Sequence, residues 1–391
     1  MLRRYVLARI LAGVVGIIVF LTAIFFGTRL LVPGDFADNF AVGGNAGDAN
    51  RVREALALDR PVWHQYLIWL GRTLSLDLGQ NPRGQPVINQ LLEALPWTLT
   101  MFALGLGAAF LVGNRIGRWA GWRKQSLTPT TLSAAALTSV FPPWLVFLAF
   151  YASLNLFGFR FFNDLTALDF YLWRPGPPQH VVLWQMMGTA LLLVVAAIAA
   201  IRFLPSRWRT IFRWTAVIVV PLAVVWWWSE IGILTRARDL LGFLAMPVLV
   251  LFLLSIGDIV LVIAASMDGL SGSDFVLTAR AKGLTDQQVR NRHAGRVALL
   301  PALSRLTANL PFALGGLVII EASFAHLGGY RIPIPGVASV LFGSLRERDL
   351  VVTMGGLVLV GVITLLLRIA LDLMVVKLDP RVQLEKVVVR A

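Results

Sequence analysis

The sequence contains no cysteine among its 391 residues. Disulfide frameworks and thiolate-bound metal sites are therefore excluded. The four histidines (His64, His180, His293 and His326) are scattered and show no metal-ligand spacing, so we expect no metal site. Charged residues are also scarce, at 14% of the chain against roughly 25% in a typical soluble domain. This low charge argues against a soluble globular protein.

Motifs of nucleotide-hydrolysing and other hydrolytic enzymes are missing as well. No G-x-x-x-x-G-K-[ST] sequence is present to cradle phosphates, so the chain is not expected to hydrolyse ATP by itself. Neither an H-E-x-x-H metal motif nor a G-x-S-x-G nucleophile turn occurs. Energy for any active transport must then come from a partner or from an ion gradient.

What the sequence contains in abundance is hydrophobic residues, at 57% of the chain and a mean hydropathy of +0.75. This composition indicates an all-α integral membrane protein, because helices satisfy their own backbone hydrogen bonds in lipid. A net charge of +14 is also found in nucleic-acid-binding proteins. An excess of Lys and Arg on the cytoplasmic side of a membrane protein produces the same total, and we favour that cause. No nucleic acid partner is expected.

About eight apolar runs are long enough to cross a bilayer. They lie near residues 10–32, 96–116, 131–157, 181–204, 211–234, 240–266, 306–324 and 351–376. Their short basic connections fall on one side, together with Arg3 and Arg4, so the positive-inside rule places both chain ends in the cytoplasm. The first run is too long for a signal peptide and is expected to stay as an uncleaved span.

The long polar stretch 33–95 carries slightly more acidic than basic residues, which suits the outer side of the membrane. Within it, helical spacing puts Val62, Tyr66, Leu70 and Leu74 on one face. The aromatic residues of this segment favour a helix lying on the outer membrane surface. A helical cap that packs on the protein's own spans is an equal alternative, and the two are compatible.

The polar stretch Ser271–Pro301, called the basic segment below, has strong helix start and stop signals. Ser273 or Asp274 is placed to cap a first helix. Arg280 and Lys282 would lie at its C-terminal end, where the helix dipole favours positive charge. Gly283 would then stop this helix, because glycine adopts the left-handed conformation without a Cβ clash.

A second short helix is expected directly after this stop. Thr285 and Gln288 have the spacing of a capping box, in which each side chain bonds to the other residue's backbone N–H. Leu284 and Val289 are spaced to pack across this cap as a hydrophobic staple. The basic segment is therefore predicted to be a shaped element with two short helices.

Two features inside the apolar runs are candidates for a translocation pathway. Pro142 and Pro143 are expected to kink the span 131–157, either lining a pathway or forming a structural bend. Asp258 is an ionisable residue within a span, which favours a role in a pathway or relay. The alternative for Asp258 is hydration from the cytoplasmic end of its span. No charged companion for it is apparent in the spans.

Four stretches of the chain form a further pattern, in this order along the sequence. They are RRYVLARI leading to LVPGDFAD; Leu58-Asp59-Arg60-Pro61 running to Leu95-Pro96-Trp97-Thr98; Thr278-Ala279-Arg280-Ala281-Lys282-Gly283-Leu284 with Arg292-His293; and Asp372 followed by Leu378-Asp379-Pro380-Arg381. In these stretches the chain resembles the B-type permease subunit of the dipeptide, oligopeptide and nickel group of ABC importers.

The resemblance implies a permease for peptides that binds no cofactor itself, with ATP and Mg²⁺ held by partner proteins. The implied partners are a second homologous permease, two cytoplasmic ATPase subunits or domains, an extracytoplasmic solute-binding protein and membrane lipid. It implies that the basic segment docks on an ATPase through Phe275, Thr278, Ala279, Arg280, Ala281, Lys282, Gly283, Leu284, Arg292 and His293. Arg290 and Arg296 would be further contacts. In the alternative, these charges only meet lipid phosphates.

Members of the resembled family usually have six spans, so residues 181–234 are interpreted as an inserted helical hairpin. The expected division is a first transmembrane helix (1–32), an extracytoplasmic helical segment (33–95), transmembrane helices 2 and 3 with an outer loop (96–180), the inserted hairpin (181–239) and the permease core (240–391), whose coupling loop is 271–301.

Two functions of other classes remain as alternatives. An ion-gradient-driven secondary transporter or channel would show inverted repeats and paired intramembrane charges. A membrane-bound enzyme or scaffold would need a catalytic cluster. Neither feature is apparent in the sequence.

Overall fold

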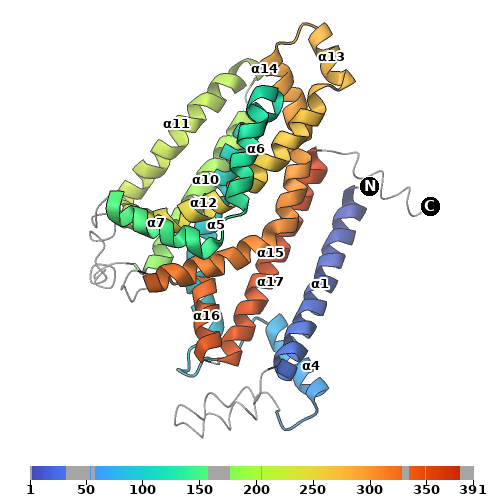
Figure 1. Ribbon diagram of the computed structural model, residues 1–391. Helices are drawn as coiled ribbons and strands as arrows, with labels where there is room; N and C mark the ends of the chain where they lie inside the picture. Colours follow the sequence, from blue (N-terminus) through green and yellow to red (C-terminus); the bar gives the residue numbers. More distant parts are fainter. Residues whose placement is uncertain are drawn as a thin grey trace, which may run out of the picture.

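A computed structural model describes residues 2–31, 53, 58–156, 177–203, 205–327, 334–347 and 349–378. Over these residues the protein is a bundle of long helices without strands, apart from one isolated bridge between Gln80 and Pro86 (Figure 1). The predicted all-α membrane architecture is confirmed. The stretch LVPGDFAD beyond its first residue, most of the outer loop 158–180 and the tail after Leu378 lie outside the described residues.

The bundle has two distinct ends. Helix α1 (Leu2–Leu31) begins, and α17 (Leu350–Leu378) finishes, toward the end that carries the short helices α13 (Asp274–Ala281) and α14 (Asp286–Gln288) (Figure 1). Helices α4 (Val62–Leu74) and α16 (Val337–Glu347) lie at the opposite end. This arrangement agrees with the predicted topology, while the assignment of one end to the cytoplasm stays a prediction.

Five helices in the described part of the chain are long and apolar enough to span a membrane, and two bent pairs bring the number to seven. Helix α11 (Ser206–Glu230) adds a shorter apolar stretch, Ile218–Glu230. The predicted eight spans correspond to these elements. Their exact number stays a prediction.

The centre of the bundle is the close pair α5 (Val87–Trp122) and α12 (Leu234–Ser271). Small residues recur at every fourth position on the face of α5 that meets α12. They are Gly105, Ala109, Gly113, Gly117 and Gly121. A Cβ added at Gly117 would lie 2.8 Å from the Cβ of Ile263, which is too close for any side chain. The small residues therefore let the two backbones approach, as at many helix interfaces in membranes.

The predicted hairpin is present as α10 (Gln179–Phe203) and α11, which pack against each other. Leu183 and Met186 of α10 are buried in the same apolar cluster as residues of α5 and α12. The indole N–H of Trp228 donates to the hydroxyl of Thr189 at 2.8 Å and joins the two helices. The hairpin is thus part of the main core. Its origin as an insertion stays a prediction.

The kink expected in the span 131–157 is present as a sharp break between two helices. The structure has two helices there, α6 (Lys124–Thr138) and α7 (Pro142–Leu156), at an angle of 99°. Pro142 and Pro143 occupy the first positions of α7, where a missing backbone N–H costs no helical hydrogen bond. The proline pair therefore starts a new helix after a sharp turn.

Helix α15 (Gly295–Leu327) is bent by 55° between Leu310 and Phe312. Pro311 stands at this point and removes a backbone hydrogen bond, which accounts for the bend. The outer half of α15 also carries a fully buried carboxylate, Glu321, which the sequence analysis did not single out. Asp258 is therefore not the only carboxylate within the spans.

Glu321 ties three helices together near the end of the molecule that carries α16. Its carboxylate accepts hydrogen bonds from the hydroxyl of Thr98 at 3.0 Å and from the backbone N–H of Ser339 at 2.9 Å. The N–H of Val337 donates to the same Thr98 hydroxyl. An acid at the first turn of α16 satisfies backbone donors that the helix leaves unpaired. Glu321 thus acts as a helix cap supplied by a distant part of the chain.

Helix α4 packs on α1. The hydroxyls of Tyr66 and Thr22 lie 2.7 Å apart, and the ring of Phe25 contacts those of Tyr66 and Trp69. Trp63 and Leu67, on another side of α4, are more than half exposed. Both predicted roles of this segment are compatible with this arrangement, since one face covers a span and another remains free to meet lipid.

Candidate functional site

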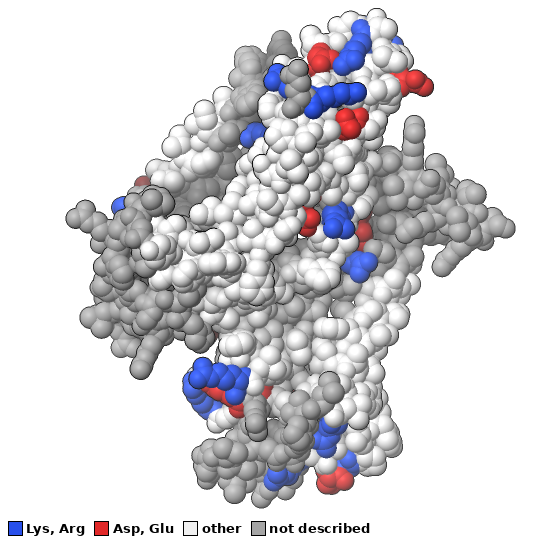
Figure 2. Space-filling model, in the orientation of Figure 1, with Lys and Arg blue, Asp and Glu red and all other residues white. Residues whose placement is uncertain are grey.

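The basic segment lies at the end of the bundle where Lys and Arg side chains gather over α13 and α14 (Figure 2). Its first helix, α13, follows α12 after only Gly272 and Ser273. The expectation of a second short helix is wrong, because α14 continues as a π-helical turn, η1 (Val289–Ala294), and then as α15. The segment is therefore joined directly to two long helices.

The N-terminal cap of α13 differs from the prediction. Ser273 is the capping residue by position, but its hydroxyl donates to the carbonyl of Leu270 at 2.6 Å. No side chain accepts from the first backbone N–H groups of α13. Asp274 is instead the first residue of the helix, where its negative charge suits the helix dipole.

The C-terminal stop of α13 confirms the prediction for Gly283. This residue has a φ of +78°, in the left-handed region. The N–H of Gly283 donates to the carbonyl of Arg280 at 2.9 Å, and that of Leu284 donates to Ala279 at 3.2 Å. These two bonds form a Schellman motif, which also brings the residue after the glycine back onto the helix.

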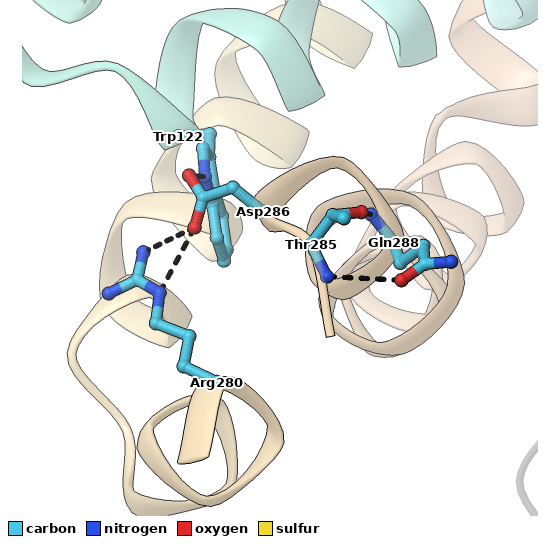
Figure 3. A network of polar contacts seen from close by, with 5 residues as sticks. All are labelled: Trp122, Arg280, Thr285, Asp286 and Gln288. Atoms are coloured by element: carbon cyan, nitrogen blue, oxygen red, sulfur yellow. Dashed lines mark hydrogen bonds and ion pairs between the residues drawn. The ribbon is translucent and has the colours of Figure 1, made fainter. Parts of the chain in front are cut away.

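The start of α14 also agrees with the prediction. The N–H of Gln288 donates to the hydroxyl of Thr285 at 3.3 Å, and the N–H of Thr285 donates to the side-chain oxygen of Gln288 at 3.0 Å (Figure 3). The capping box is therefore complete. Leu284 and Val289 pack in one apolar cluster with Val276 and Ala279 of α13. This cluster holds the two parts of the basic segment against each other.

A polar network, which sequence reasoning did not find, ties the basic segment to the end of α5. It consists of Trp122, Arg280 and Asp286 and is called the Trp122 clasp below (Figure 3). The indole N–H of Trp122 donates to one carboxylate oxygen of Asp286 at 2.9 Å. Two nitrogens of Arg280 lie 3.0 and 2.9 Å from the other oxygen. The guanidinium also lies over the indole ring, 5.6 Å from its centre.

The electrostatics of the clasp favour the ionised form of Asp286. The hydrogen bond from Trp122 lowers the pKa of the Asp286 carboxyl below its ordinary value, and the hydrogen bond and charge of Arg280 lower it further. Burial raises this pKa, but with a smaller effect than the indole hydrogen bond. The clasp is therefore formed by a carboxylate throughout the physiological pH range.

The clasp and the apolar cluster divide the predicted docking residues into two groups. Ala279 is buried against the chain, Leu284 packs in the cluster and Arg280 is bound by Asp286, so these residues maintain the shape of the segment. The outward-facing group is Phe275, Thr278, Ala281, Lys282, Arg292 and His293. Arg296 is also exposed and Arg290 is half-buried. The outward surface of α13 is thus apolar at Phe275 and basic at Lys282.

A second polar site lies among α6, α12 and α15. It is a cavity of about 280 Å³, called the polar cavity below. Its polar lining residues are Thr138, Ser255, Asp258, Arg305 and Asn309, and Pro142, the first residue of α7, also lines it. The side-chain amide of Asn309 donates to the carboxylate of Asp258 at 3.0 Å. The cavity thus brings together two of the three residues proposed for a pathway, Pro142 and Asp258, whereas Pro143 is not among its lining residues.

Asp258 shares this cavity with a basic residue, Arg305, which lies directly before the predicted span 306–324. Arg305 and Asn309 are four residues apart and so project from one face of α15. That spacing was visible in the sequence, but the approach of α12 to α15 was not. For the Trp122 clasp no local signal existed, since Trp122 and Asp286 are far apart in the chain.

Comparisons with known proteins find similar sequences among membrane transport proteins. A family model described as "Binding-protein-dependent transport system inner membrane component" matches residues 192–384, which include the basic segment and the cavity residues of α12 and α15. A protein named as a peptide permease in Brucella ovis is similar at 27% identity over 393 residues, covering 97% of this chain and 99% of the relative.

Two further relatives are similar over almost their whole length. The dipeptide transport system permease protein DppB of Escherichia coli K12 is 25% identical over 374 residues, covering 94% of this chain and 95% of its own. A protein named as a peptide transport system permease in Brucella abortus is 25% identical over 357 residues, covering 90% of each chain. The similarity therefore extends well beyond the segment matched by the family model.

Proposed function

Because this chain belongs to the family of binding-protein-dependent transport system inner membrane components, we propose that it is the permease subunit of an ATP-driven importer of peptides. The names of its relatives support peptides as the cargo. The proposed complex contains a second permease, two cytoplasmic ATPase subunits or domains and an extracytoplasmic solute-binding protein. It resides in the cytoplasmic membrane of a bacterium or archaeon.

The observation that carries this proposal is the rigid shape of the basic segment. Its outward surface, with Phe275, Thr278 and Lys282, offers an apolar and basic face to an ATPase groove. The segment continues into α12 on one side and into α15 on the other, and the Trp122 clasp ties it to α5. A displacement of α13 by a closing ATPase pair would therefore move three long helices together.

Transport would follow from a two-state change of these helices. ATP bound to the partner subunits would shift the balance between the two states from the cytoplasmic side. The loaded binding protein would shift it from the outer side. The polar cavity between α12 and α15 is then a part of the solute pathway, with Asp258 and Pro142 on its wall. Pro143, next to the turn between α6 and α7, would help to hold that wall.

The test is purification of the chain with its native partners and reconstitution into proteoliposomes. We expect ATPase subunits to co-purify and peptide uptake to require ATP, the binding protein and both permeases. Uptake should stop when the ATPase subunits are removed. Gradient-driven uptake of peptide by this polypeptide alone would contradict the proposal and would favour a secondary transporter.

A further inference from the structure

We infer that the polar cavity is a binding site for the two charged ends of a short peptide. Asp258 would bind the free ammonium group and Arg305 the free carboxylate, with Asn309 holding Asp258 in position. The inference rests on the proposed function and adds to it the chemical class of ligand and the residues that recognise it.

Residues from one face of α12 and one face of α15 form the walls of the cavity. Ser255, Asp258 and Val262 lie three or four residues apart and share one face of α12. On α15, Arg305, Asn309 and Ala313 are four residues apart and also share one face, which lines the same cavity as the face of α12. Thr138 and Pro142 close a third side at the turn between α6 and α7. The polar groups of three elements therefore line one cavity, with Asp258 half-buried and Arg305 exposed.

The charged groups of Asp258 and Arg305 in this cavity do not neutralise each other. Asp258 accepts the amide of Asn309 and forms no ion pair with Arg305. Arg305 forms neither a hydrogen bond nor an ion pair within the described part of the chain. Charged groups within membrane spans are costly unless they face partners or water in a cavity. Opposite charges that are kept apart across one cavity are suited to a ligand with both charges.

Position along the helices supports the same conclusion. Asp258 lies 13 residues before the end of α12, which corresponds to about 20 Å of helix. Helix α12 runs to Ser271, beyond the predicted end of its span at residue 266. Figure 2 shows a few charged side chains in the otherwise uncharged middle of this face. Here an isolated charge is expensive, and a ligand that neutralises it is correspondingly favoured.

The volume of the polar cavity suits a small ligand. Sites for small molecules enclose roughly 300–1,000 Å³, and the polar cavity, at about 280 Å³, lies at the lower limit. Such a space suits a dipeptide or one portion of a longer peptide, with apolar lining from Leu251, Leu254 and Leu306 for its side chains. The cavity therefore selects peptides whose free ammonium and carboxylate groups lie close together, and it accepts different peptide side chains.

The absence of cysteine from this chain provides a direct test. The variant Ser255→Cys places one thiol on the cavity wall, and the reporter is the rate at which a small methanethiosulfonate reagent labels this chain in the reconstituted importer. Dialanine is the zwitterionic probe, and N-acetyl-dialanine amide is the matched uncharged probe. We expect millimolar dialanine to slow labelling at least threefold and the blocked peptide to leave it unchanged.

Two further variants connect this protection to the proposed residues. Asp258→Asn or Arg305→Gln, added to Ser255→Cys, should remove the protection by dialanine. The control is Ser304→Cys, an exposed position on α15 outside the cavity, where neither peptide should alter the labelling rate. Equal protection by both peptides, or protection that persists in both charge variants, would overturn the inference.

The failure of the inference can be separated from the failure of the proposed function. ATP-dependent uptake by the importer with the unaltered chain is measured in the same vesicles. If uptake is normal and dialanine does not protect Ser255→Cys, the peptide importer stands and the binding site is refuted. If neither importer activity nor protection is found, the proposed function itself fails.

Discussion

The basic segment and the polar cavity both concentrate charged groups, but they are built in opposite ways. The basic segment is shaped by residues within about thirty positions of one another, through the Gly283 stop, the Thr285–Gln288 capping box and the cluster around Val276. The polar cavity is assembled from α6, α12 and α15, and even Asp258 and Asn309, which are hydrogen-bonded in it, are 51 positions apart. Local rules therefore describe the first region and tertiary packing creates the second.

The largest effect is expected in the polar cavity. Asp258→Asn or Arg305→Gln should lower ATP-dependent peptide uptake at least tenfold, because each change removes one of the two charges that bind the peptide. ATP hydrolysis stimulated by the loaded binding protein should persist, since the basic segment is untouched. Matched controls are Asp268→Asn and Arg238→Gln on α12, outside the cavity, which should retain uptake. Equal losses in the controls would refute a specific role of the cavity.

The next effect concerns the left-handed glycine of the basic segment. Gly283→Val should weaken association with the ATPase subunits about five- to thirtyfold, because a left-handed residue with a Cβ costs roughly 1–2 kcal/mol. No atom lies within 4 Å of the added Cβ, so the cost comes from the backbone conformation alone. Co-purification of the ATPase subunits is the measurement, with membrane insertion unaffected.

The chain offers a matched control for this change. Gly272→Val alters a glycine eleven residues earlier, which has a φ of −100° and likewise no atom near the added Cβ. It should leave assembly intact. Gly283→Asn should restore most of the association, since asparagine tolerates the left-handed region. If Gly272→Val and Gly283→Val behave alike, the cap has no special role in docking.

A smaller effect is expected from the Trp122 clasp. Trp122→Phe removes the indole N–H that donates to Asp286. This change should raise the ATP hydrolysed per peptide imported about twofold, because a typical intramolecular hydrogen bond contributes only about 1 kcal/mol. Asp286→Asn should have a similar effect, and the two changes together should have no more effect than either alone. The coupling ratio in proteoliposomes is the measurement.

Variants of Lys282 and Arg280 should separate binding of the ATPase subunits from the coupling of ATP hydrolysis to peptide uptake. It is exposed, and within the described residues it has no ion-pair partner, so Lys282→Gln should weaken ATPase binding without altering the coupling ratio. Arg280→Gln should do the reverse, because Arg280 is bound within the clasp. If the two variants have the same phenotype, the division of the basic segment into shape-holding and outward residues is wrong.

The smallest effect is the pH dependence of the clasp. A carboxyl whose pKa is lowered on folding adds stability that is present above its ordinary pKa and is lost as pH falls through the lowered value. For Asp286 the ordinary value is 3.8, so the clasp should remain complete from pH 5.5 to 8. The difference in coupling ratio between the unaltered chain and Asp286→Asn should be constant over that range. If this difference disappears by pH 5.5, Asp286 is protonated at that pH and its pKa is not lowered by the clasp.

Much of the basic segment could be predicted because its signals are short-range. The hydrogen bonds around Gly283, Thr285 and Gln288 join groups three to five residues apart, and each of these residues is found in the expected role. The error at Ser273 has the same origin, since its hydroxyl had a competing acceptor in Leu270, within the preceding helix. Local chemistry allowed both outcomes and the chain path selected one of them.

The polar cavity and the Trp122 clasp could not be derived in the same way. Asp258 and Asn309 are 51 residues apart, and Trp122 and Asp286 are 164 apart. The sequence shows that α5 carries small residues at every fourth position, but it does not say which helix will occupy that face. The same limit applies to Glu321, whose partners Thr98 and Ser339 come from two other parts of the chain.

By itself, the sequence determined that this protein is a helical membrane protein whose basic segment has strong helix start and stop signals, and that it has no G-x-x-x-x-G-K-[ST] motif. These properties follow from composition and from hydrogen bonds between residues that are close along the chain. Only the tertiary structure decided that Pro142 starts a helix, that Arg280 holds Asp286 and that Asp258 shares a cavity with Arg305. The physical reason is that burial and charge pairing depend on which helix faces meet, and this is settled by packing over the whole bundle.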